Sequence, residues 1–585
     1  MKLIDGFQSL AAAPNGVARL RKLILTLAVR GRLTAQSESD EPASALLQKI
    51  QVERIKLGGK RNLRGSETST TANTNSLCEL PSGWEWASLG QLGSFAGGKT
   101  PSTTRSEYWG GEMPWVTPKD MKSFDINDSQ DYVTERATDD GLGIIPANSV
   151  LLVVRSGILR RMVPVAINLR ACTVNQDLKA LTPYLPEMAP YIRMVIRGFE
   201  DYILQQLTKI GTTVESIRFE DFERQPFPIP PLDEQARIVA KVDELMRLCD
   251  ELESRGRLEA KQHAQLTATL FDALAASESS HALAENWARV AAHFDLLLDR
   301  PEAVDALEQT ILQLAVRGAL VPQVAGDEPT VALLARLRIE REQWLQSRAG
   351  SDPECRTALK KLAELPAPDS PFQIPETWAF VRLLDCSRLL VDCHNKTAPY
   401  TPSGIPIIRT TNVRDGRFRF DDLRFVTRET YEFWSRRCPP EPGDIIFTRE
   451  APMGEAAVIP EGAIFCLGQR TMLIRPMHGY VNTEYLLLAL TEPHLLERAT
   501  PSAIGSTVKH LRVGDVERLS IPLPPVAEQA RIVGRVEELR RLCADLRERL
   551  TARQTCQAHL AEVLVEQAAS SAPLAEHTAD LAAAA

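Results

Sequence analysis

Two long segments of the chain carry apolar residues at helical spacing, with polar and charged residues between them. In both segments the steps alternate between 4 and 3 residues, which is typical of a heptad seam on a long helix. We predict spacer helices over residues 232–276 and 526–568 that pair with each other in antiparallel orientation. The alternative is that each helix packs separately on its own domain. The seam residues are Ile238, Val242, Leu245, Cys249 and Leu252 in the first helix and Ile532, Val536, Leu539, Cys543, Leu546 and Leu550 in the second, and Gly256 interrupts the first seam.

Shorter patterns surround these helices. Apolar residues three and four apart predict two helices over residues 14–57, and Pro42 suits the first turn of the second one. Elsewhere the chain has short apolar runs between glycines and prolines, which are typical of buried strands separated by turns. Residues 150–154 and 218–229 are the clearest of these runs, and we predict strands there.

The patterns together predict an α+β protein in which two mixed α/β domains are joined by the two long antiparallel helices. We assign these domains to residues 80–231 and 374–525, which are called the first and second domain below. The remaining segments are a helical lead-in (1–59), a linker (60–79), a linker with a second helical lead-in (277–348), a further linker (349–373) and a disordered tail (569–585).

Several motifs occur twice. Residues 25–33 (LTLAVRGRL) return as 312–320 (LQLAVRGAL), and Asp-Glu-Pro at 40–42 returns at 327–329, both with an offset of 287 residues. Residues 230–239 (PPLDEQARIV) return as 524–533 (PPVAEQARIV) with an offset of 294 residues. Such offsets are far longer than the period of a solenoid or propeller repeat. They indicate a duplicated unit of domain plus helix and predict pseudo-twofold symmetry.

The composition, with 44% hydrophobic and 25% charged residues, is typical of a soluble globular protein. The N-terminus has no run of signal-peptide length and no stretch approaches about 18 uninterrupted apolar residues, so we expect a cytoplasmic protein with no membrane contact. The ten cysteines include no CxxC pair, which argues against a disulfide framework or a zinc ribbon. Cys386, Cys393 and His394 are close in sequence, but ordinary thiols are the favoured interpretation and no metal site is predicted.

Net charge places a constraint on nucleic-acid binding. The whole chain carries −8; the first domain has 15 basic against 18 acidic residues, or −3, and the second has 18 against 18, or zero. A domain that holds DNA alone by counterion release is normally basic. If this protein binds DNA, its basic residues are concentrated on one face or partner proteins supply phosphate contacts.

Residues 93–100 (GSFAGGKT) match the P-loop pattern G-x-x-x-x-G-K-T. A working P-loop also needs a preceding strand and a helix that follows immediately and helps to hold the phosphates. The residues after Thr100 have loop composition, and the second copy keeps Lys396-Thr397 but none of the glycines. We interpret the match as coincidental and keep a polar, basic loop as the shared feature.

No other arrangement suggests catalysis. The chain has no G-x-S-x-G, no H-E-x-x-H, no kinase motif set and no methyltransferase-type (Asn/Asp)-Pro-Pro-(Tyr/Phe) tetrad. The many carboxylates lie on predicted helices as solvated faces. We therefore predict no catalytic residues and no cofactor bound by this chain.

Polar and basic residues occupy corresponding positions in the two domains, where they suit contacts with DNA. Arginine, lysine, asparagine and glutamine can read base edges, while hydroxyls and glycine amides suit phosphates. Each residue alone could equally be an ordinary surface or capping residue. The candidate DNA-contacting residues are Lys99, Thr100, Thr103, Arg105, Thr117, Lys119, Arg155, Arg160, Gln176, Thr212 and Thr213 in the first domain, and Lys396, Arg409, Thr411, Asn412, Arg414, Arg449, Gln469, Arg470, Ser506, Thr507 and Lys509 in the second.

The order of lead-in, variable domain and Pro-Pro-x-x-Glu-Gln helix, repeated once, resembles the specificity (S) subunit of type I restriction–modification systems. The carriers are residues 110–117, 229–239 and 523–533 and both Leu-Ala-Val-Arg-Gly motifs. The resemblance implies that each domain reads one half of a bipartite double-stranded DNA target and that the paired helices set the gap. The chain departs from the simplest family layout in its extended lead-ins, which we interpret as additional subunit-docking surface.

The resemblance also implies the partners. They are DNA methyltransferase subunits, two in number, and restriction/translocase subunits that join through them. S-adenosylmethionine, ATP and Mg²⁺ belong to these partners, and this chain has no activity of its own. A specificity subunit of a related type II enzyme and a P-loop nucleotide hydrolase are the alternatives. A pure coiled-coil scaffold is disfavoured because the two domains make up half of the chain.

Overall fold

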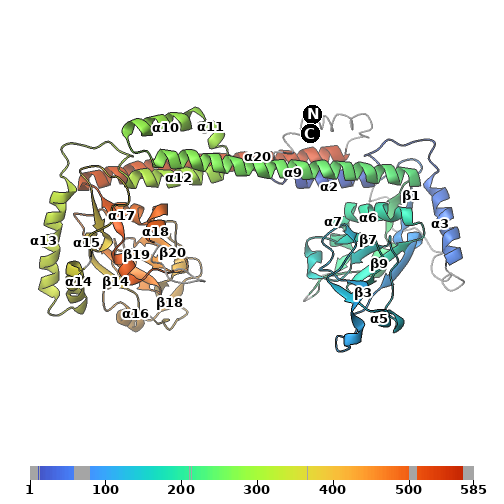
Figure 1. Cartoon of the computed structure of the whole chain (residues 1–585), viewed down its shortest axis with the longest axis horizontal. Helices are drawn as coiled ribbons and strands as arrows, with labels where there is room; N and C mark the ends of the chain where they lie inside the picture. Colours follow the sequence, from blue (N-terminus) through green and yellow to red (C-terminus); the bar gives the residue numbers. More distant parts are fainter. Residues whose placement is uncertain are drawn as a thin grey trace. The chain divides into compact units, whose positions relative to one another are not determined.

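A computed structural model describes residues 11, 13–57, 79–209, 211, 214–364, 366–394, 396–499 and 510–570. The chain forms two compact units, one of residues Met1–Glu259 and Arg553–Ala585 and the other of residues Ala260–Ala552. Each unit contains one β-rich domain, the helices that precede it, and part of each of the two long helices (Figure 1). In the described part of the chain, no helix combines the length and the apolarity that crossing a membrane requires.

In the first unit, the lead-in forms the two helices predicted from its spacing. α2 (Gly16–Val29) buries Leu20, Leu23 and Leu27 on one face, as a 3.6-residue repeat requires. α3 (Ala43–Leu57) begins directly after Pro42, which cannot donate a backbone N–H and so suits a helix start. The apolar face of α2 packs inside the unit, so that face is not a surface for subunit docking.

The first domain is built around a five-stranded sheet of order β2-β9-β6-β7-β4, beside a three-stranded sheet of order β5-β3-β8. The predicted strand at 150–154 is confirmed as β6, a central strand with all four residues buried. The prediction at 218–229 is half wrong: α8 (Phe219–Arg224) occupies its first part, because Phe222 turns inward at helical spacing, and only β12 (Pro226–Ile229) is a strand. The elements are β1 (Glu85–Ser88), α4 (Leu89–Leu92), β2 (Gly93–Gly97), η2 (Ser106–Tyr108), β3 (Trp109–Val116), β4 (Asp125–Ile126), β5 (Asp131–Val133), α5 (Glu135–Asp139), β6 (Val150–Val153), η3 (Gly157–Arg160), β7 (Val165–Asn168), β8 (Thr173–Val174), β9 (Leu178–Pro183), η4 (Pro186–Met188), α6 (Ala189–Gly198), α7 (Glu200–Gln206), β10 (Thr208–Lys209), β11 (Ser216–Ile217), α8 and β12.

The second domain repeats the central part of this topology. Its sheets have the orders β14-β22-β19-β20 and β18-β15-β21, so β14, β22 and β19 correspond to β2, β9 and β6. The elements are β13 (Ala379–Arg382), α15 (Leu383–Cys386), β14 (Ser387–Asp392), β15 (Ile405–Ile408), η5 (Thr410–Asn412), β16 (Val413–Arg414), β17 (Arg417–Phe418), β18 (Arg424–Val426), α16 (Arg428–Trp434), β19 (Ile445–Arg449), β20 (Met453–Val458), β21 (Cys466–Leu467), β22 (Thr471–Pro476), α17 (Thr483–Leu490), α18 (Pro493–Ala499), α19 (Val513–Glu517) and β23 (Ser520–Leu523).

In the described part of the chain, five helices lie between α9 and the second domain. They are α10 (Ser280–Ala292), α11 (Phe294–Leu297), α12 (Pro301–Val316), α13 (Thr330–Arg348) and α14 (Pro353–Glu364). The prediction that residues 349–373 are a linker is wrong for its central part, because α14 lies there. This helix packs on α13 and on β14 of the second domain (Figure 1).

The motifs that occur twice meet at the junction between each domain and its helices. In the first unit, Trp84 Nε1 donates to Glu234 Oε2 at 2.9 Å, and Arg237 lies 2.5 Å from Asp40. The second unit has the same contacts 294 and 287 residues further on. Trp378 donates to Glu528 at 3.0 Å, and Arg531 lies 2.5 Å from Asp327. The near-verbatim repetition of these motifs therefore preserves one structural joint.

A glycine in each Leu-Ala-Val-Arg-Gly motif completes the joint. Gly31 and Gly318 have positive φ angles of +64° and +72°, a conformation that costs other residues strain. A Cβ atom at Gly31 would lie 2.4 Å from Pro81, and one at Gly318 would lie 2.5 Å from Pro375. Both the backbone angle and the close proline contact therefore require glycine here.

The two long helices are continuous, α9 over Leu232–Ala275 and α20 over Val526–Ser570, and α9 runs through Gly256 without a break. All predicted seam residues are buried or half-buried. In the first unit the α9 seam shares a core with α2 and α6, and Ala561 of α20 joins that core. In the second unit the α20 seam packs with α12 and α17. The seams thus pack first on the lead-in and domain of their own unit.

Candidate nucleic-acid interface

Strand register brings one set of polar residues to the same end of the main sheet in each domain. In the first domain Gly97 of β2 pairs with Lys179 of β9, which also pairs with Leu152 of β6. Because neighbouring strands are antiparallel, the end of β2, the start of β9 and the end of β6 lie together. The residues just beyond these points are Lys99, Thr100, Gln176 and Arg155, which are called the first polar edge below.

The second domain has the matching arrangement. Asp392 of β14 pairs with Met472 of β22, which also pairs with Phe447 of β19. The side chains at this end are Lys396, Thr397, Gln469 and Arg449, which are called the second polar edge below. Thr397 was noted in the sequence only as part of the Lys-Thr pair, and its position equivalent to Thr100 is the signal that identifies it.

A threonine–glutamine hydrogen bond occurs in both edges. Thr100 Oγ1 donates to Gln176 Oε1 at 2.7 Å, and Thr397 Oγ1 donates to Gln469 Oε1 at 3.2 Å. The hydroxyl thereby fixes which way the side-chain amide points. Gln176 is exposed, and among the residues that the structure describes its Nε2 group has no hydrogen-bond acceptor, so it can still donate.

The arginines of both edges are held by carboxylates. Arg155 Nε donates to Asp177 at 2.8 Å, and Arg449 lies 2.8 Å from Asp392. Arg155 is half-exposed at 53%, whereas Arg449 is only 16% exposed. The sequence does not indicate this difference, because Asp177 lies in the turn before β9 whereas Asp392 ends β14, so the two carboxylates have no common offset.

The lysines differ from the arginines. Lys99 and Lys396 are exposed, and no side-chain partner of either ammonium group occurs among the residues that the structure describes. An exposed ammonium group without a carboxylate partner keeps its full charge for an external anion. These two lysines are therefore the positions in the polar edges that are best prepared to meet a phosphate.

Further arginines predicted from the sequence border the edges and are also paired. Arg160 Nε lies 2.6 Å from Glu215, whose pKa it lowers through that hydrogen bond. Arg470 lies 3.0 Å from Glu450, and its backbone N–H donates to Cys393 Sγ at 3.1 Å. Pairing of this kind explains how arginine-rich edges coexist with a net domain charge near zero.

The turn after β3 and its counterpart after β15 lie beside the edges, because β3 runs parallel to β8 and β15 runs parallel to β21. Here two predictions are wrong. Thr117 is 5% exposed and donates to Asp120, and Asn412 is 1% exposed and bonds the backbone around residues 409–421. Both side chains hold their own turn, so neither is available to DNA.

The other candidates in these turns remain at the surface. Lys119 pairs with Asp131 at 2.7 Å, and Arg409 pairs with Asp422 at 3.0 Å, which lowers the pKa of Asp422. Thr411 is exposed, and Arg414 is half-buried and donates to two backbone carbonyls.

Two candidates lie further along the loop after β2, and five cannot be placed. Thr103 is exposed, and Arg105 donates to the Tyr108 hydroxyl at 2.6 Å. Thr212, Thr213, Ser506, Thr507 and Lys509 lie outside the described residues.

The P-loop interpretation of residues 93–100 is not supported by the local structure. Residues Gly93–Gly97 form strand β2 itself, and the next helical element is the three-residue turn at Ser106–Tyr108. A Cβ at Gly98 would lie 1.6 Å from the Val174 carbonyl oxygen, so this backbone is packed against β8. The loop therefore offers neither an open phosphate cradle nor a helix N-terminus.

The cysteine–histidine group also gives no metal site. Among the described residues, no three His, Cys, Asp or Glu side chains are placed to hold a metal ion. Burial raises the pKa of Cys386 to about 12 and also raises the pKa of Cys393, so both thiols stay protonated. His394 instead lies against Trp434, with ring centroids 4.4 Å apart.

Comparison with known proteins agrees with this architecture. The Type I restriction modification DNA specificity domain matches residues 81–262 and 375–553, together more than half of the chain. The chain is 30% identical to the type I restriction enzyme EcoAI specificity subunit of Escherichia coli and 28% identical to the EcoEI specificity subunit, and each alignment covers 94% of both proteins. A chain from a solved structure of a type I R-M system aligns over 84% of this chain and 99% of its own length, with 18% identity and a TM-score of 0.45. This chain belongs to the family of type I restriction–modification specificity subunits.

Proposed function

We propose that this chain is the non-catalytic DNA-recognition subunit of a type I restriction–modification enzyme and that its two domains read the two halves of a bipartite site in double-stranded DNA. One observation carries the proposal: lysine, threonine, glutamine and arginine stand at the same sheet end in both domains. Between these edges and the repeated joints, the two domains diverge strongly in sequence. This combination is expected of two domains that recognise different DNA sequences and are attached to one duplicated set of helices.

Each group in the polar edges has a role that suits its chemistry. The unpaired ammonium groups of Lys99 and Lys396 contact phosphates and place the domain on the duplex. The amide of Gln176, oriented by its bond to Thr100, can meet the edge of a base, since glutamine matches the donor and acceptor pattern of adenine. Arg155 keeps N–H groups beyond the one that Asp177 accepts, and these can donate to DNA.

The two long helices pair in antiparallel orientation and set the gap between the half-sites. Contacts inside each unit support this. Ala561, near the end of α20, lies in one core with Cys249 in the first half of α9. Phe271, near the end of α9, lies in one core with Leu546 in the first half of α20. Each long helix thus has the far part of the other beside it.

The partners are DNA methyltransferase subunits, two in number, with restriction/translocase subunits joining through them. S-adenosylmethionine, ATP and Mg²⁺ act at sites in these subunits, and the present chain supplies recognition. The charge of the domains supports a shared task. Arginines in both domains are paired with carboxylates, and the net charge is −3 for the first domain and zero for the second. Neither domain therefore carries the excess of basic residues expected of a protein that holds DNA alone.

Domain exchange tests the proposal. Residues 80–231 are replaced by the equivalent domain of the EcoAI specificity subunit, and the complex is expressed with its methyltransferase. Sequencing of methylated sites in the host chromosome then gives the target. We expect one half-site to change and the other to stay as in the wild type. A change in both halves, or in neither, would contradict modular recognition, and absence of any methylated site in the wild type would contradict DNA recognition itself.

A further inference from the structure

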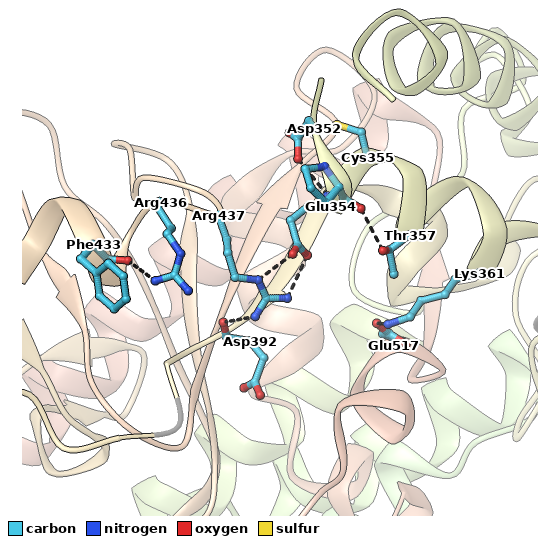
Figure 2. A network of polar contacts seen from close by, with 11 residues as sticks. Asp352, Glu354, Cys355, Thr357, Lys361, Asp392, Phe433, Arg436, Arg437 and Glu517 are labelled. Carbon is cyan, nitrogen blue, oxygen red and sulfur yellow. Dashed lines mark hydrogen bonds and ion pairs between the residues drawn. The ribbon is translucent and has the colours of Figure 1, made fainter. Parts of the chain in front are cut away.

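Helix α14 docks on the second domain beside the second polar edge. Cys355, on its inward face, is fully buried in a core that also contains Val391 and Cys393 of the strand and loop leading to Lys396. Leu359 and Leu362 pack on the same core, and Lys361 forms an ion pair with Glu517 of α19 (Figure 2). The helix is therefore an integral part of the second domain.

Glu354, in the first turn of α14, forms a two-point polar contact between the helix and the domain. Its carboxylate accepts two hydrogen bonds from Arg437, at 2.7 and 2.8 Å (Figure 2). A two-point bond between a carboxylate and a guanidinium group fixes direction as well as distance. The Glu354 bond also raises the pKa of Arg437, and Glu354 itself is only 21% exposed. Arg437 is 41% exposed, so solvent reaches the pair mainly from the arginine side.

Arg437 also contacts β14, the strand that leads to the second polar edge. Its NH1 group donates to the backbone carbonyl of Asp392, the last residue of β14, at 3.3 Å (Figure 2). The carboxylate of the same Asp392 pairs with Arg449, at 2.8 Å. One residue therefore receives the α14 contact on its backbone and holds an edge arginine with its side chain. Lys396 and Thr397 follow Asp392 by four and five residues in the chain.

A second contact holds the same segment from the side of α16. The His394 ring lies 4.4 Å from the Trp434 ring and 5.7 Å from the Phe433 ring. Arg436, next to Arg437, lies over Phe433 at 4.0 Å. The segment from Asp392 to His394 is thus held at Asp392 by Arg437 and at His394 by the Trp434 and Phe433 rings.

We propose that α14 is a positioning element for DNA recognition by the second domain, in which Glu354, acting through Arg437, sets the place of Asp392 and hence of Lys396, Thr397 and Arg449. Glu354 itself does not touch DNA. This inference rests on the proposed function. It deepens that function by adding a residue that controls how well one half-site is read.

We place the effect at the half-site read by the second domain, because α14, Arg437 and Asp392 all lie in the unit that contains that domain. At the offset of 287 residues, Thr68 and Asn75 stand where α14 has Cys355 and Leu362. Both residues lie outside the described residues, and their polar side chains do not match the apolar Cys355 and Leu362.

The test uses the full chain assembled with its methyltransferase. Glu354→Gln keeps the size of the side chain but removes its charge, and Arg437→Lys keeps the charge but removes the two-point bond. The control is Glu432→Gln, which breaks an exposed pair with Arg428 on α16 that shares no residue with the contacts of Glu354, Arg437 and Asp392. Competition binding compares the correct duplex with duplexes altered by one base in either half, the halves being assigned by the domain exchange.

We expect both variants to lose discrimination about fivefold at the half read by the second domain, and to keep it at the other half. The control should discriminate as the wild type does. Unchanged discrimination in both variants, or equal losses at both halves, would overturn the inference. A wild-type complex that discriminates at neither half would instead overturn the proposed function, so the two failures are distinguishable.

Discussion

The lysines of the polar edges permit a quantitative test of DNA contact. Replacing Lys99 or Lys396 by Gln removes one positive charge and, because neither ammonium group has a carboxylate partner in the described part of the chain, exposes no buried or unpaired anion. The arginines do not allow so clean a change. Removing Arg155, for example, would leave Asp177 facing DNA without its partner.

The size of the effect follows from counterion release. Each phosphate neutralised contributes about −0.9 to the slope of log affinity against log salt. A fourfold rise in salt therefore weakens binding by about 3.5-fold for each lysine–phosphate contact. We expect each single variant to have a slope shallower by about 0.9, and the double variant by about 1.8.

Fluorescence anisotropy of the assembled complex on its target duplex, measured from about 50 to 200 mM KCl, gives the slope. The control is Lys49→Gln on α3, an exposed lysine of the lead-in that is paired with Glu41, which should leave the slope unchanged. If Lys99→Gln and Lys396→Gln also leave the slope at the wild-type value, these lysines do not meet phosphates, and the assignment of the polar edges to DNA is wrong.

Two further predictions concern the spacer and the joint. Adding seven residues after Gly256 in α9 and after Leu550 in α20 lengthens both helices by about 10 Å. The gap between the half-sites should then grow by about three base pairs, which sequencing of methylated sites measures. Altered half-site sequences with an unchanged gap would contradict the spacer role. Burial raises the pKa of Glu528 above its ordinary 4.5. The folded state therefore binds the Glu528 proton more tightly than the unfolded chain does. The stability that this proton contributes is present below pH 4.5 and is lost as pH rises through the raised pKa. Glu528→Gln should therefore flatten the loss of thermal stability above pH 4.5 in calorimetry, whereas Glu538→Gln, at an exposed site, should keep the wild-type profile.

The sequence predicted the long helices well, because the spacing of their apolar residues is enough to identify them. Heptad steps identified α9 and α20, and their seam residues are indeed buried or half-buried. Spacing does not say which surface covers a seam, however. The contacts of Ile238 and Val242 with the α2 and α6 core depend on how residues far apart in sequence meet.

Helix α14 shows where the pattern was present but missed. Cys355, Leu359 and Leu362 lie four and three residues apart, which is helical spacing. The flanking prolines and the polar residues around them gave the segment the composition of a linker. Burial of Cys355 against the second domain is a tertiary effect that local composition does not contain.

The candidate site was predictable only as a set of positions. Aligning the two copies placed Arg155 with Arg449 and Gln176 with Gln469, and the sheet brings both pairs to equivalent places. The same alignment misassigned Asn412, because the side chains that cap turns are of the same types as those that read bases. Only the hydrogen bonds distinguish these two uses.

The first and last strands of each domain pair with each other, β1 with β12 and β13 with β23. Glu85 lies opposite Ile229, and Ala379 lies opposite Leu523, so the chain enters and leaves each domain at one place. Each domain is therefore attached to the rest of the chain at a single place. This place is formed by the tryptophan, glutamate and glycine of the joint. Under the proposed function, recombination within the motifs of the joint would replace one whole domain, and with it one half of the recognised sequence, while α9 and α20 would stay unchanged.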